Sequence, residues 1–531
     1  MIDCFFIGHN GINISKQLQI TAAAYGRNSY YFRDALSARY IKYNGKRYTQ
    51  YQIYNLFYNN NDALSATFDH ATFQHNFNSA IAILGSYVHK KGLSIDYVHS
   101  FNMDKQELAK KLEKNNIRVI AIPTTFYLSL YPILEIVYFI RKYNKTAKII
   151  IGGPYVLNQV KGQSPANLQK IFQAIGADVY ICSNEGEYAL SEVVRAFHDN
   201  TELYEINNIF FRQEDNTYGH NTLTLEENSS EDKHINWSLF TGGLTQYASI
   251  RTAVSCPFSC AFCGLPITGG KYRQLSVAEI EDQLDTLAKS NKVSGLFFID
   301  ETFNYPPERF KEILRMMIKN NYNFKWESEF RCQFADREMI EMMKESGCVQ
   351  VFCGIESGSQ QILNNMNKKA IVEEYKKGLG LLHEYDILTN ALIIIGFPGE
   401  TYETYKETYN FLQETKPTFF RTHRWYYDHE TPIYDKRKEY NITGNGYEWA
   451  HSTMDADTAH NLTDELTMSV NSSIHIADYP ISFFLYEQGF SVEKIKHFME
   501  TFNKCVNERI KNPDCEEVSQ ERVEELKYAL R

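Results

Sequence analysis

The sequence predicts an α/β protein in three parts: an N-terminal doubly wound domain of Rossmann or flavodoxin type, a central partial TIM-like (β/α) barrel, and a mostly helical C-terminal segment. Three observations predict this class. Strand-length apolar runs alternate with helix-length segments from residue 75 to residue 424, a polar stretch interrupts the alternation at 200–247, and the alternation stops after Arg424. The chain has 531 residues, which is enough for about three units. The expected boundaries are 1–199 with an insertion at 11–74, a connector at 200–247, a barrel at 248–435 and a helical segment at 436–531 that caps the substrate.

The N-terminal part begins with an apolar strand at 2–7, and its periodicity then weakens over the Asn- and Tyr-rich insertion. Regular alternation follows, with helices expected at 78–90, 104–114 and 128–141, and strands at 94–98, 119–122, 148–151 and 178–181. This pattern predicts a parallel sheet, in which ligands bind at the carboxyl ends of the strands. Small or polar residues occur at those ends: Gly8, His9, Asn10, Ser100, Thr124, Thr125, Gly152, Gly153, Ser183, Glu185 and Gly186. A plain turn also needs glycine after a strand, so Gly152 and Gly153 alone leave turn and ligand contact open.

The central part begins with a strand at 248–254 that leads into a loop with three cysteines. Helices are then expected at 277–290, 307–320, 337–346, 371–385 and 402–414, and strands at 295–299, 325–330, 349–352, 388–395 and 418–424. The cysteine loop therefore lies at the C-terminal end of a strand, where barrel folds keep their chemistry.

The loop Cys256-Pro-Phe-Ser-Cys260-Ala-Phe-Cys263 could be half of a zinc site, a chance disulfide, or the three-point anchor of an iron-sulfur cluster. Structural zinc needs four ligands, and no further Cys or Cys-His pair stands nearby at ligand spacing. A cubane cluster bound by three cysteines leaves one iron open to a substrate or cosubstrate. This pattern favours the cluster.

Composition narrows the class of protein. The chain is 43% hydrophobic and 23% charged, which is typical of a soluble globular protein, and its net charge of -10 comes without a basic stripe for nucleic acid. The N-terminus lacks the basic region of a signal peptide, and no apolar run reaches membrane length. Ten irregularly spaced cysteines indicate reduced thiols. The sequence predicts a cytoplasmic protein without nucleic-acid or membrane partners.

The spacing of Cys256, Cys260 and Cys263, with Phe262 before the last thiol, resembles the radical S-adenosylmethionine (SAM) superfamily. Four later strings stand at family positions, namely FIDE from 298, the strand segment 326–331, GIESGS from 354 and IIGFPGE from 394. The resemblance covers residues 80 to 435. It implies a 4Fe-4S cluster on the three catalytic cysteines, whose open iron binds SAM, and reductive cleavage of SAM to methionine and a 5′-deoxyadenosyl radical.

The same resemblance implies the SAM-binding residues. They are Asp300 and Glu301 for the amino group, Glu329 and Arg331 for the ribose or carboxylate, Glu356 and Ser357 after the fourth strand, and Ile395 and Gly396 for adenine. Glu356 and Arg331 would also suit a barrel salt bridge. Cys332, Cys348 and Cys353 are expected to be buried, inert thiols, and the isolated Cys505 and Cys515 predict no auxiliary cluster.

The N-terminal runs IRVIAIPTT, AKIIIGGPYV and GADVYICSNEGEYAL resemble the cobalamin-binding domain that precedes many radical SAM enzymes. The resemblance implies cobalamin contacts from Gly8, His9, Asn10, Thr124, Thr125, Gly152, Gly153, Ser183 and Glu185. The Asp-x-His-x-x-Gly signature is absent from this domain, and the string at His234 lacks its glycine. Cobalt is therefore expected to have no lower histidine ligand from the protein.

The C-terminal string YEWAHSTM from 447 is similar to the phosphinate P-methyltransferase branch of these enzymes, which the long insertion also fits. Trp449, His451, Thr453, Met454 and Asp455 either line the substrate pocket or form a packed loop with a helix cap.

The leading hypothesis is a cobalamin-dependent radical SAM methyltransferase that methylates an unactivated carbon or a phosphinate phosphorus of a small molecule or peptide. Its electrons would come from a reductant such as flavodoxin or ferredoxin. A second hypothesis keeps both cofactors but catalyses rearrangement, cyclisation or epimerisation. A third is a non-enzymatic sensor of cobalamin or cluster. A tRNA methylthiotransferase is disfavoured, because a second cysteine triad and a basic C-terminal barrel are missing.

Overall fold

The computed structural model describes residues 1–12, 14–36, 40–61, 75–114, 116–127, 129–477, 480–512 and 517–531; Cys515 lies outside them. The chain divides into two compact units. Unit 1 comprises Met1–Gly11, Phe73–Ser249 and Arg273–Val293, and unit 2 comprises Ile12–Thr72, Ile250–Tyr272 and Ser294–Arg531. This division differs from the predicted boundaries in that the insertion groups with unit 2 and the connector with unit 1.

Unit 1 is built on a seven-stranded sheet in the order β4-β1-β5-β6-β7-β8-β9. Its strands are β1 (Ile2–His9), β4 (Ile95–Ser100), β5 (Ile117–Pro123), β6 (Lys148–Gly152), β7 (Val179–Ile181), β8 (Ile209–Arg212) and β9 (Tyr218–His220). The first five of that order run parallel, and the hairpin β8-β9 adds two antiparallel strands from the predicted connector. The parallel strands follow the flavodoxin-like order, whose switch point lies between β1 and β5. The predicted doubly wound domain is confirmed.

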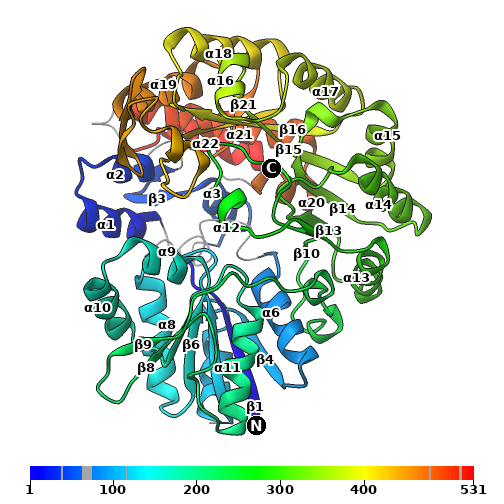
Figure 1. The fold of residues 1–531 in the computed structure, drawn as a ribbon. Coiled ribbons are helices and arrows are strands. Elements are labelled where there is room, and N and C mark those ends of the chain that lie inside the picture. Colours follow the sequence, from blue (N-terminus) through cyan, green and yellow to red (C-terminus); the bar gives the residue numbers. More distant parts are fainter. Residues whose placement is uncertain are drawn as a thin grey trace. The chain divides into compact units, whose positions relative to one another are not determined.

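Helices cover the two faces of this sheet (Figure 1). They are α6 (Ser79–Lys90), α7 (Lys105–Glu113), α8 (Tyr131–Tyr143), α9 (Pro154–Gly162), α10 (Pro165–Ile175) and α11 (Glu187–Asp199). Helix α13 (Val277–Ser290) follows the cysteine loop and contacts the short 3-10 helix Trp237–Leu239. Helix α6 packs against α11, and α8 packs against α7 and α10. In α8, Ile133, Ile136 and Ile140 recur at helical spacing and join the buried core, because this spacing puts them on one face.

Unit 2 is built on a second seven-stranded sheet in the order β10-β13-β14-β15-β16-β17-β21. Its strands are β10 (Tyr247–Ile250), β13 (Gly295–Phe298), β14 (Lys325–Phe330), β15 (Cys348–Glu356), β16 (Leu388–Ile395), β17 (Phe419–Arg424) and β21 (Ile474–His475). Neighbours from β13 to β21 pair in parallel, and the order is open, which confirms a partial barrel. The sequence predicted that the strand at 418–424, here β17, is the last one of the barrel. This prediction is wrong, because β21 from the C-terminal segment pairs with β17.

Helices between these strands complete the α/β pattern of unit 2. They are α14 (Pro307–Lys319), α15 (Arg337–Glu345), α16 (Gln360–Asn365), α17 (Val372–Glu384) and α18 (Tyr402–Thr415). In α14 the apolar residues Phe310, Ile313, Leu314 and Met317 share a buried face. The predicted helices therefore appear with small shifts at their ends.

The insertion and the C-terminal segment pack together within unit 2. The insertion contains α1 (Ile14–Tyr25), α2 (Tyr30–Leu36), β2 (Ile41–Tyr43), β3 (Lys46–Tyr48) and α3 (Gln50–Phe57). The C-terminal segment contains β18 (Thr443–Asn445), β19 (Glu448–His451), β20 (Met454–Asp455), α19 (Ala456–Ser469), α20 (Ile481–Glu487), α21 (Val492–Lys511) and α22 (Gln520–Leu530). Edge-to-face contacts of Tyr51 and Tyr54 with Phe484 join α3 to α20. Among the described residues, no helix is both long and apolar enough to cross a bilayer.

Candidate active site

The three cysteines lie on the loop between β11 (Ala253–Val254) and the short helix α12 (Leu265–Thr268). Cys260 is buried, and Cys256 and Cys263 are half-buried. The backbone N–H of Ala261 donates to the carbonyl of Met366 at 2.7 Å, and the Ala261 carbonyl accepts from the N–H of Ile433 at 3.0 Å. Two distant segments therefore hold the middle of the cysteine loop.

The thiols are in surroundings that suit metal-bound sulfur. Burial raises the pKa of Cys260 and raises that of Cys263 to about 11, while Lys368 and Arg331 act in the opposite direction on the pKa of Cys260. A buried thiolate needs positive charge beside it, and a bound metal supplies that charge. In the described part of the chain, no three His, Cys, Asp or Glu side chains converge on the position of a single ion. An iron-sulfur cluster takes each thiolate on a different iron, so this donor set fits a cluster.

Asp300, directly after β13, contacts the chain that leads into the cysteine loop. Its carboxylate accepts hydrogen bonds from the N–H groups of Thr252 (2.7 Å) and Ala253 (2.9 Å) and from the Thr252 hydroxyl. Arg309 donates to the carbonyl of the same Thr252 at 2.9 Å. Asp300 is 2% exposed, and these contacts give it a role in positioning the loop.

Glu329 on β14 lies near two other carboxylates. Burial raises its pKa to about 8, and the charges of Glu301 and Glu356 act in the same direction. Glu301 is exposed. These predicted SAM-binding residues therefore interact electrostatically with one another, and Glu329 carries its proton near neutral pH.

Arg331 braces the cysteine loop. Its guanidinium lies 3.7 Å from the ring centre of Phe258, which belongs to the loop, and it donates a hydrogen bond to the carbonyl of Lys368. Asn304 fixes the Arg331 backbone by accepting from its N–H (2.9 Å) and donating to its carbonyl (3.0 Å). The contact with Phe258 is a cation–π interaction, so Arg331 stabilises the loop directly.

A bulge at the end of β15 turns Glu356 toward Lys368. The pairing of β15 with β16 shifts register between Gly354 and Glu356, and Glu356 adopts a positive φ of 64°. Its carboxylate lies 2.7 Å from Nζ of Lys368, and both side chains are buried. A bulge re-aims a side chain in this manner, and here it produces the salt bridge that the sequence left as an alternative.

Ser357, Ile395 and Gly396 complete the predicted SAM-binding set. The Ser357 hydroxyl is buried and lies 3.1 Å from that of Thr408 on α18. Gly396 follows Ile395 at the end of β16 with a φ of 91°, and its N–H donates to Glu400 at 2.5 Å. A side chain at Gly396 would meet the Trp449 ring at 2.6 Å, so only glycine fits there.

The C-terminal loop with Trp449 and His451 packs tightly. Both residues are buried, and their rings stack with centroids 5.1 Å apart. Asp455 caps α19 by accepting from the N–H of Thr458 at 2.8 Å, and Thr453 is exposed. The structure thus shows the packed, capped loop that the sequence offered as one of two alternatives.

In unit 1, the predicted ligand residues gather at the carboxyl ends of the parallel strands. Asn10 after β1 is 1% exposed and donates to Glu135 at 3.1 Å, while its N–H donates to the Tyr127 hydroxyl at 2.8 Å. His9 stacks on the Tyr127 ring at 5.3 Å. The ends of β1 and β5 are thus linked through Tyr127, at the switch point of the sheet.

The other predicted residues of this edge have partners within unit 1. The Thr124 hydroxyl donates to the carbonyl of Gly152 at 2.8 Å, and Thr125 is exposed. Gly8 is required because a side chain there would overlap the His99 carbonyl oxygen at 1.7 Å, and Gly153 has a φ of 108°. These glycines let neighbouring backbone segments lie close together, which explains them as turn residues. Contact of these glycines with a ligand stays a prediction.

Ser183 and Glu185 belong to a buried polar network. The Ser183 hydroxyl donates to Glu226 at 3.0 Å. Glu185 pairs with Lys233 at 2.7 Å and with Arg273, and Lys233 also pairs with Glu187 at 2.6 Å. The cations Lys233 and Arg273 offset burial and lower the pKa of Glu185. Sequence analysis missed this network, because its members are far apart and follow no motif.

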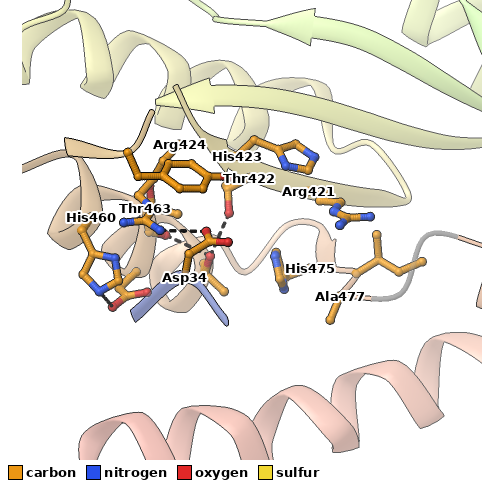
Figure 2. A pocket seen from close by; sticks show the side chains of 13 residues that line it. Asp34, Arg421, Thr422, His423, Arg424, His460, Thr463, His475 and Ala477 are labelled. Atoms are coloured by element: carbon orange, nitrogen blue, oxygen red, sulfur yellow. Dashed lines mark hydrogen bonds and ion pairs between the residues drawn. The ribbon is translucent and has the colours of Figure 1, made fainter. Parts of the chain in front are cut away.

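A pocket in unit 2 opens along β17 (Figure 2). It is lined by Asp34, Arg421, Thr422, His423, Arg424, Tyr447, His460, Thr463, Asp464, Thr467, His475, Ile476 and Ala477. Asp34 comes from the insertion and Arg424 from β17, and their side chains form an ion pair of 2.7 Å. Sequence analysis singled out neither residue, since no motif contains them.

Comparison with known proteins identifies the central part of the chain. The family model described as the radical SAM superfamily matches residues 250–412. The chain contains a radical SAM domain. The matched segment begins just before the cysteine loop and includes Asp300, Glu329, Arg331, Glu356 and Gly396.

Two solved structures share the fold over more than the radical SAM domain. The cobalamin-dependent S-adenosylmethionine radical enzyme OxsB, with aqua-cobalamin bound, superposes with a TM-score of 0.60 at 17% identity, over 82% of this chain and 70% of its own. The radical S-adenosylmethionine methyltransferase TsrM from Kitasatospora setae, with cobalamin and a [4Fe-4S] cluster bound, gives 0.54 at 16% identity, over 68% and 75%. At 16–17% sequence identity, the similarity to these two structures shows a shared fold alone.

Sequence relatives of the chain include methyltransferases and a cyclase. An uncharacterized methyltransferase of Pyrococcus horikoshii is 24% identical over 61% of this chain and 68% of its own. The bacteriochlorophyllide d C-12(1)-methyltransferase of Chlorobaculum tepidum is 27% identical over 33% and 39%, and the anaerobic magnesium-protoporphyrin IX monomethyl ester cyclase of Rubrivivax gelatinosus is 28% identical over 31% and 30%. The chain thus spans well under half the length of the last two.

Proposed function

We propose that this chain is a cobalamin-dependent radical SAM methyltransferase. It methylates an unactivated carbon or a phosphinate phosphorus of a specialised metabolite or peptide. The observation that carries the proposal is the three-cysteine loop of a radical SAM domain in a chain whose other unit has a flavodoxin-like parallel sheet. The fold shared with OxsB and TsrM, and the methyltransferases among the relatives, support it.

Cys256, Cys260 and Cys263 would hold three irons of a 4Fe-4S cluster. When bound and reduced, the cluster supplies the electron that cleaves SAM. The chain's own residues prepare the site, because Asp300 and Arg331 fix the loop and the Glu356–Lys368 pair places charge beside Cys260. SAM would lie along the carboxyl ends of β13 to β16, at Glu301, Glu329, Glu356, Ser357, Ile395 and Gly396.

Cobalamin would bind at the carboxyl edge of the unit 1 sheet and supply the methyl carrier. The residues proposed to contact it are Gly8, His9, Asn10, Thr124, Thr125, Gly152, Gly153, Ser183 and Glu185. The buried Asn10 side chain fits such a role, because its Oδ1 has no hydrogen-bond partner among the described residues. The network around Glu185 would act by holding the β7 end in place.

The remaining partners follow from the chemistry. A small molecule or peptide is the substrate, and a flavodoxin or ferredoxin in the cytoplasm would reduce the cluster. A nucleic-acid substrate is disfavoured, because the chain has a net charge of -10 and nucleic acid is also negatively charged.

Deuterated-methyl SAM tests methyl transfer. Reconstituted enzyme with cobalamin, reductant and candidate phosphinates or peptides should give product three mass units heavier than product from unlabelled SAM. The Cys256→Ala/Cys260→Ala/Cys263→Ala variant should give none. Deoxyadenosine formation with substrate conversion but without deuterium in the product contradicts the proposal.

The cyclase among the relatives favours one alternative, a cobalamin-binding radical SAM enzyme that rearranges or cyclises its substrate without net methyl transfer. The same labelling experiment separates the two functions, because only the methyltransferase puts deuterium into the product.

A further inference from the structure

We propose that the β17 pocket binds an anionic end group of the substrate, a carboxylate or a phosphinate-type oxyanion, and that Arg424 is the residue that holds it. The inference rests on the proposed enzymatic function and names the class of group that its substrate carries. Its evidence is the geometry of the pocket in unit 2.

The pocket forms beside part of a strand edge that has no paired strand among the described residues. Strand β17 pairs with β16 from Phe419 to Arg424, whereas β21 on its other side pairs with Phe419 and Phe420. The second half of the β17 edge therefore faces the pocket, and α19 lines another side through His460 and Thr463 (Figure 2). The lining holds two arginines, Arg421 and Arg424, two aspartates, Asp34 and Asp464, and the histidines His423, His460 and His475.

Arg424 is a buried cation with unused hydrogen-bonding capacity. Its side chain is 4% exposed, and Nη2 donates to Oδ1 of Asp34 at 2.7 Å. Nη1 is buried and has no hydrogen-bond partner among the described residues. A buried, unpaired N–H of a charged group costs free energy, and an oxyanion in the pocket would remove that cost. The planar guanidinium matches the paired oxygens of a carboxylate or phosphinate.

The two acids of the pocket already have partners. Asp34 pairs with Arg424, and Asp464 lies 3.6 Å from Nε2 of His460, whose pKa is lowered by burial. Tyr447 packs on the guanidinium at 5.0 Å and orients it. An incoming anion therefore competes with Asp34 for Arg424 while Arg421 adds positive charge to the lining.

The insertion gains a role from this arrangement. Helix α2 is attached to α19 by Tyr30 and Arg33, which contact Asp457 at 3.0 and 2.6 Å, and this attachment brings Asp34 to the pocket. The insertion thus supplies one wall of the site and the acid that tunes the affinity of Arg424 for anions.

Binding of simple oxyanions to the full-length protein, without cluster, SAM or cobalamin, tests the inference. Phenylphosphinate, inorganic phosphate and acetate are titrated separately and followed by ligand NMR and calorimetry. Arg424→Gln should weaken binding by about tenfold or more, and Arg424→Lys should give an intermediate loss because it keeps the charge but not the planar fork. Asp34→Asn should tighten binding severalfold, since the competing carboxylate is gone. The preferred anion then distinguishes a phosphinate from a carboxylate substrate.

Arg315→Gln is the matched control, because Arg315 lies on α14 outside the pocket, is half exposed and pairs with Glu338. It should leave binding unchanged. Equal binding by wild type and Arg424→Gln, loss of binding in Asp34→Asn, or no binding by wild type at millimolar concentrations overturns the proposal. Circular dichroism and thermal melting show whether each variant is folded. If Arg424→Gln does not fold, the binding change in Asp34→Asn decides the question.

A purely structural ion pair predicts that Arg424→Gln and Asp34→Asn lower stability alike and that neither changes binding. SAM cleavage by reconstituted protein is measured separately. Oxyanion binding without SAM cleavage refutes the proposed function and leaves the anion site standing, whereas the reverse result refutes only the anion site.

Discussion

Nε2 of His451 lies 3.1 Å from the carbonyl oxygen of Gly396, so the hairpin β19-β20 contacts the turn that follows β16. Nδ1 of the same ring lies 3.2 Å from the Thr453 hydroxyl, which donates to it when Nε2 carries the proton. Trp449 stacks on the His451 ring and fills the space above Gly396. The C-terminal segment therefore fixes the turn that is proposed to receive adenine.

Gly396→Ala should destabilise the protein by at least about 1–2 kcal/mol. The residue has a positive φ, which is costly for an L side chain, and the new methyl would meet Trp449. Urea denaturation of the apo protein measures the effect. Gly380→Ala on α17 is the control, because nothing lies near that position and alanine favours a helix. Equal stability of the two variants would show that the turn is not constrained as described.

Glu400→Gln should become more stable relative to wild type as pH rises from about 5 to 8. Burial raises the pKa of Glu400 to about 8 from an ordinary 4.5. The native protein therefore keeps a proton that the unfolded chain loses, and wild-type stability falls by about 1.4 kcal/mol per pH unit in that window. Glutamine has no such proton, while its oxygen still accepts from the Gly396 N–H.

The free energy of unfolding of wild type and Glu400→Gln is measured by denaturation at several pH values. Both proteins contain His451, which also contacts the Gly396 turn. Glu403→Gln, at an exposed position in the first turn of α18, should show no such rise, since hydrogen bonding lowers the pKa of Glu403. A difference between Glu400→Gln and wild type that stays flat across this range argues against a buried, neutral Glu400.

Asp300→Asn should loosen the cysteine loop. The N–H groups of Thr252 and Ala253 share Oδ1, so an amide that keeps its oxygen there places its NH2 group against the Thr252 hydroxyl, which loses its buried acceptor at a cost of about 1–3 kcal/mol. Iron and sulfide content after anaerobic reconstitution should fall below wild type, and the melting temperature should fall as well. Asp285→Asn, on the surface of α13, should retain both. Wild-type iron content in Asp300→Asn would contradict the positioning role.

Glu356→Gln and Lys368→Met should each destabilise the apo protein by about 3–5 kcal/mol, because each leaves a buried charge without its partner. The double variant should cost clearly less than the sum, which a double-mutant cycle measures. The pair of the half-buried Lys376 with the exposed Glu414 provides the control, and Lys376→Met should cost no more than about 1 kcal/mol. Additive losses at Glu356 and Lys368 would mean that the two side chains are not coupled.

Local patterns in the sequence were sufficient for the two sheets and the cysteine loop. The apolar run at 248–254 ends where the loop begins, although it forms two short strands, β10 and β11, and not one. The alternation of strands and helices predicted parallel strands, which both sheets contain. Gly8 and Gly396 stand at predicted strand ends, but the contacts that require glycine there, with the His99 carbonyl and the Trp449 ring, come from distant segments.

Long-range contacts could not be predicted in the same way. Asp34 meets Arg424 across 390 positions, and Glu185 finds Lys233 and Arg273 in segments that carry no motif. Strand β21 has two residues, too few for a periodic signal, yet it sets the extent of the β17 pocket. Such features depend on how elements pack, so the substrate side of unit 2 was the part least visible in the sequence.

The central claim is that Cys256, Cys260 and Cys263 hold a cluster that cleaves SAM. Anaerobic reconstitution with iron and sulfide, followed by reduction in the presence of SAM, tests it most directly. Wild type and the control Cys505→Ala should turn brown and release 5′-deoxyadenosine or S-adenosylhomocysteine, while the triple Cys→Ala variant should stay colourless and inactive. A colourless wild type, or a triple variant that keeps the cluster absorbance, would contradict the account.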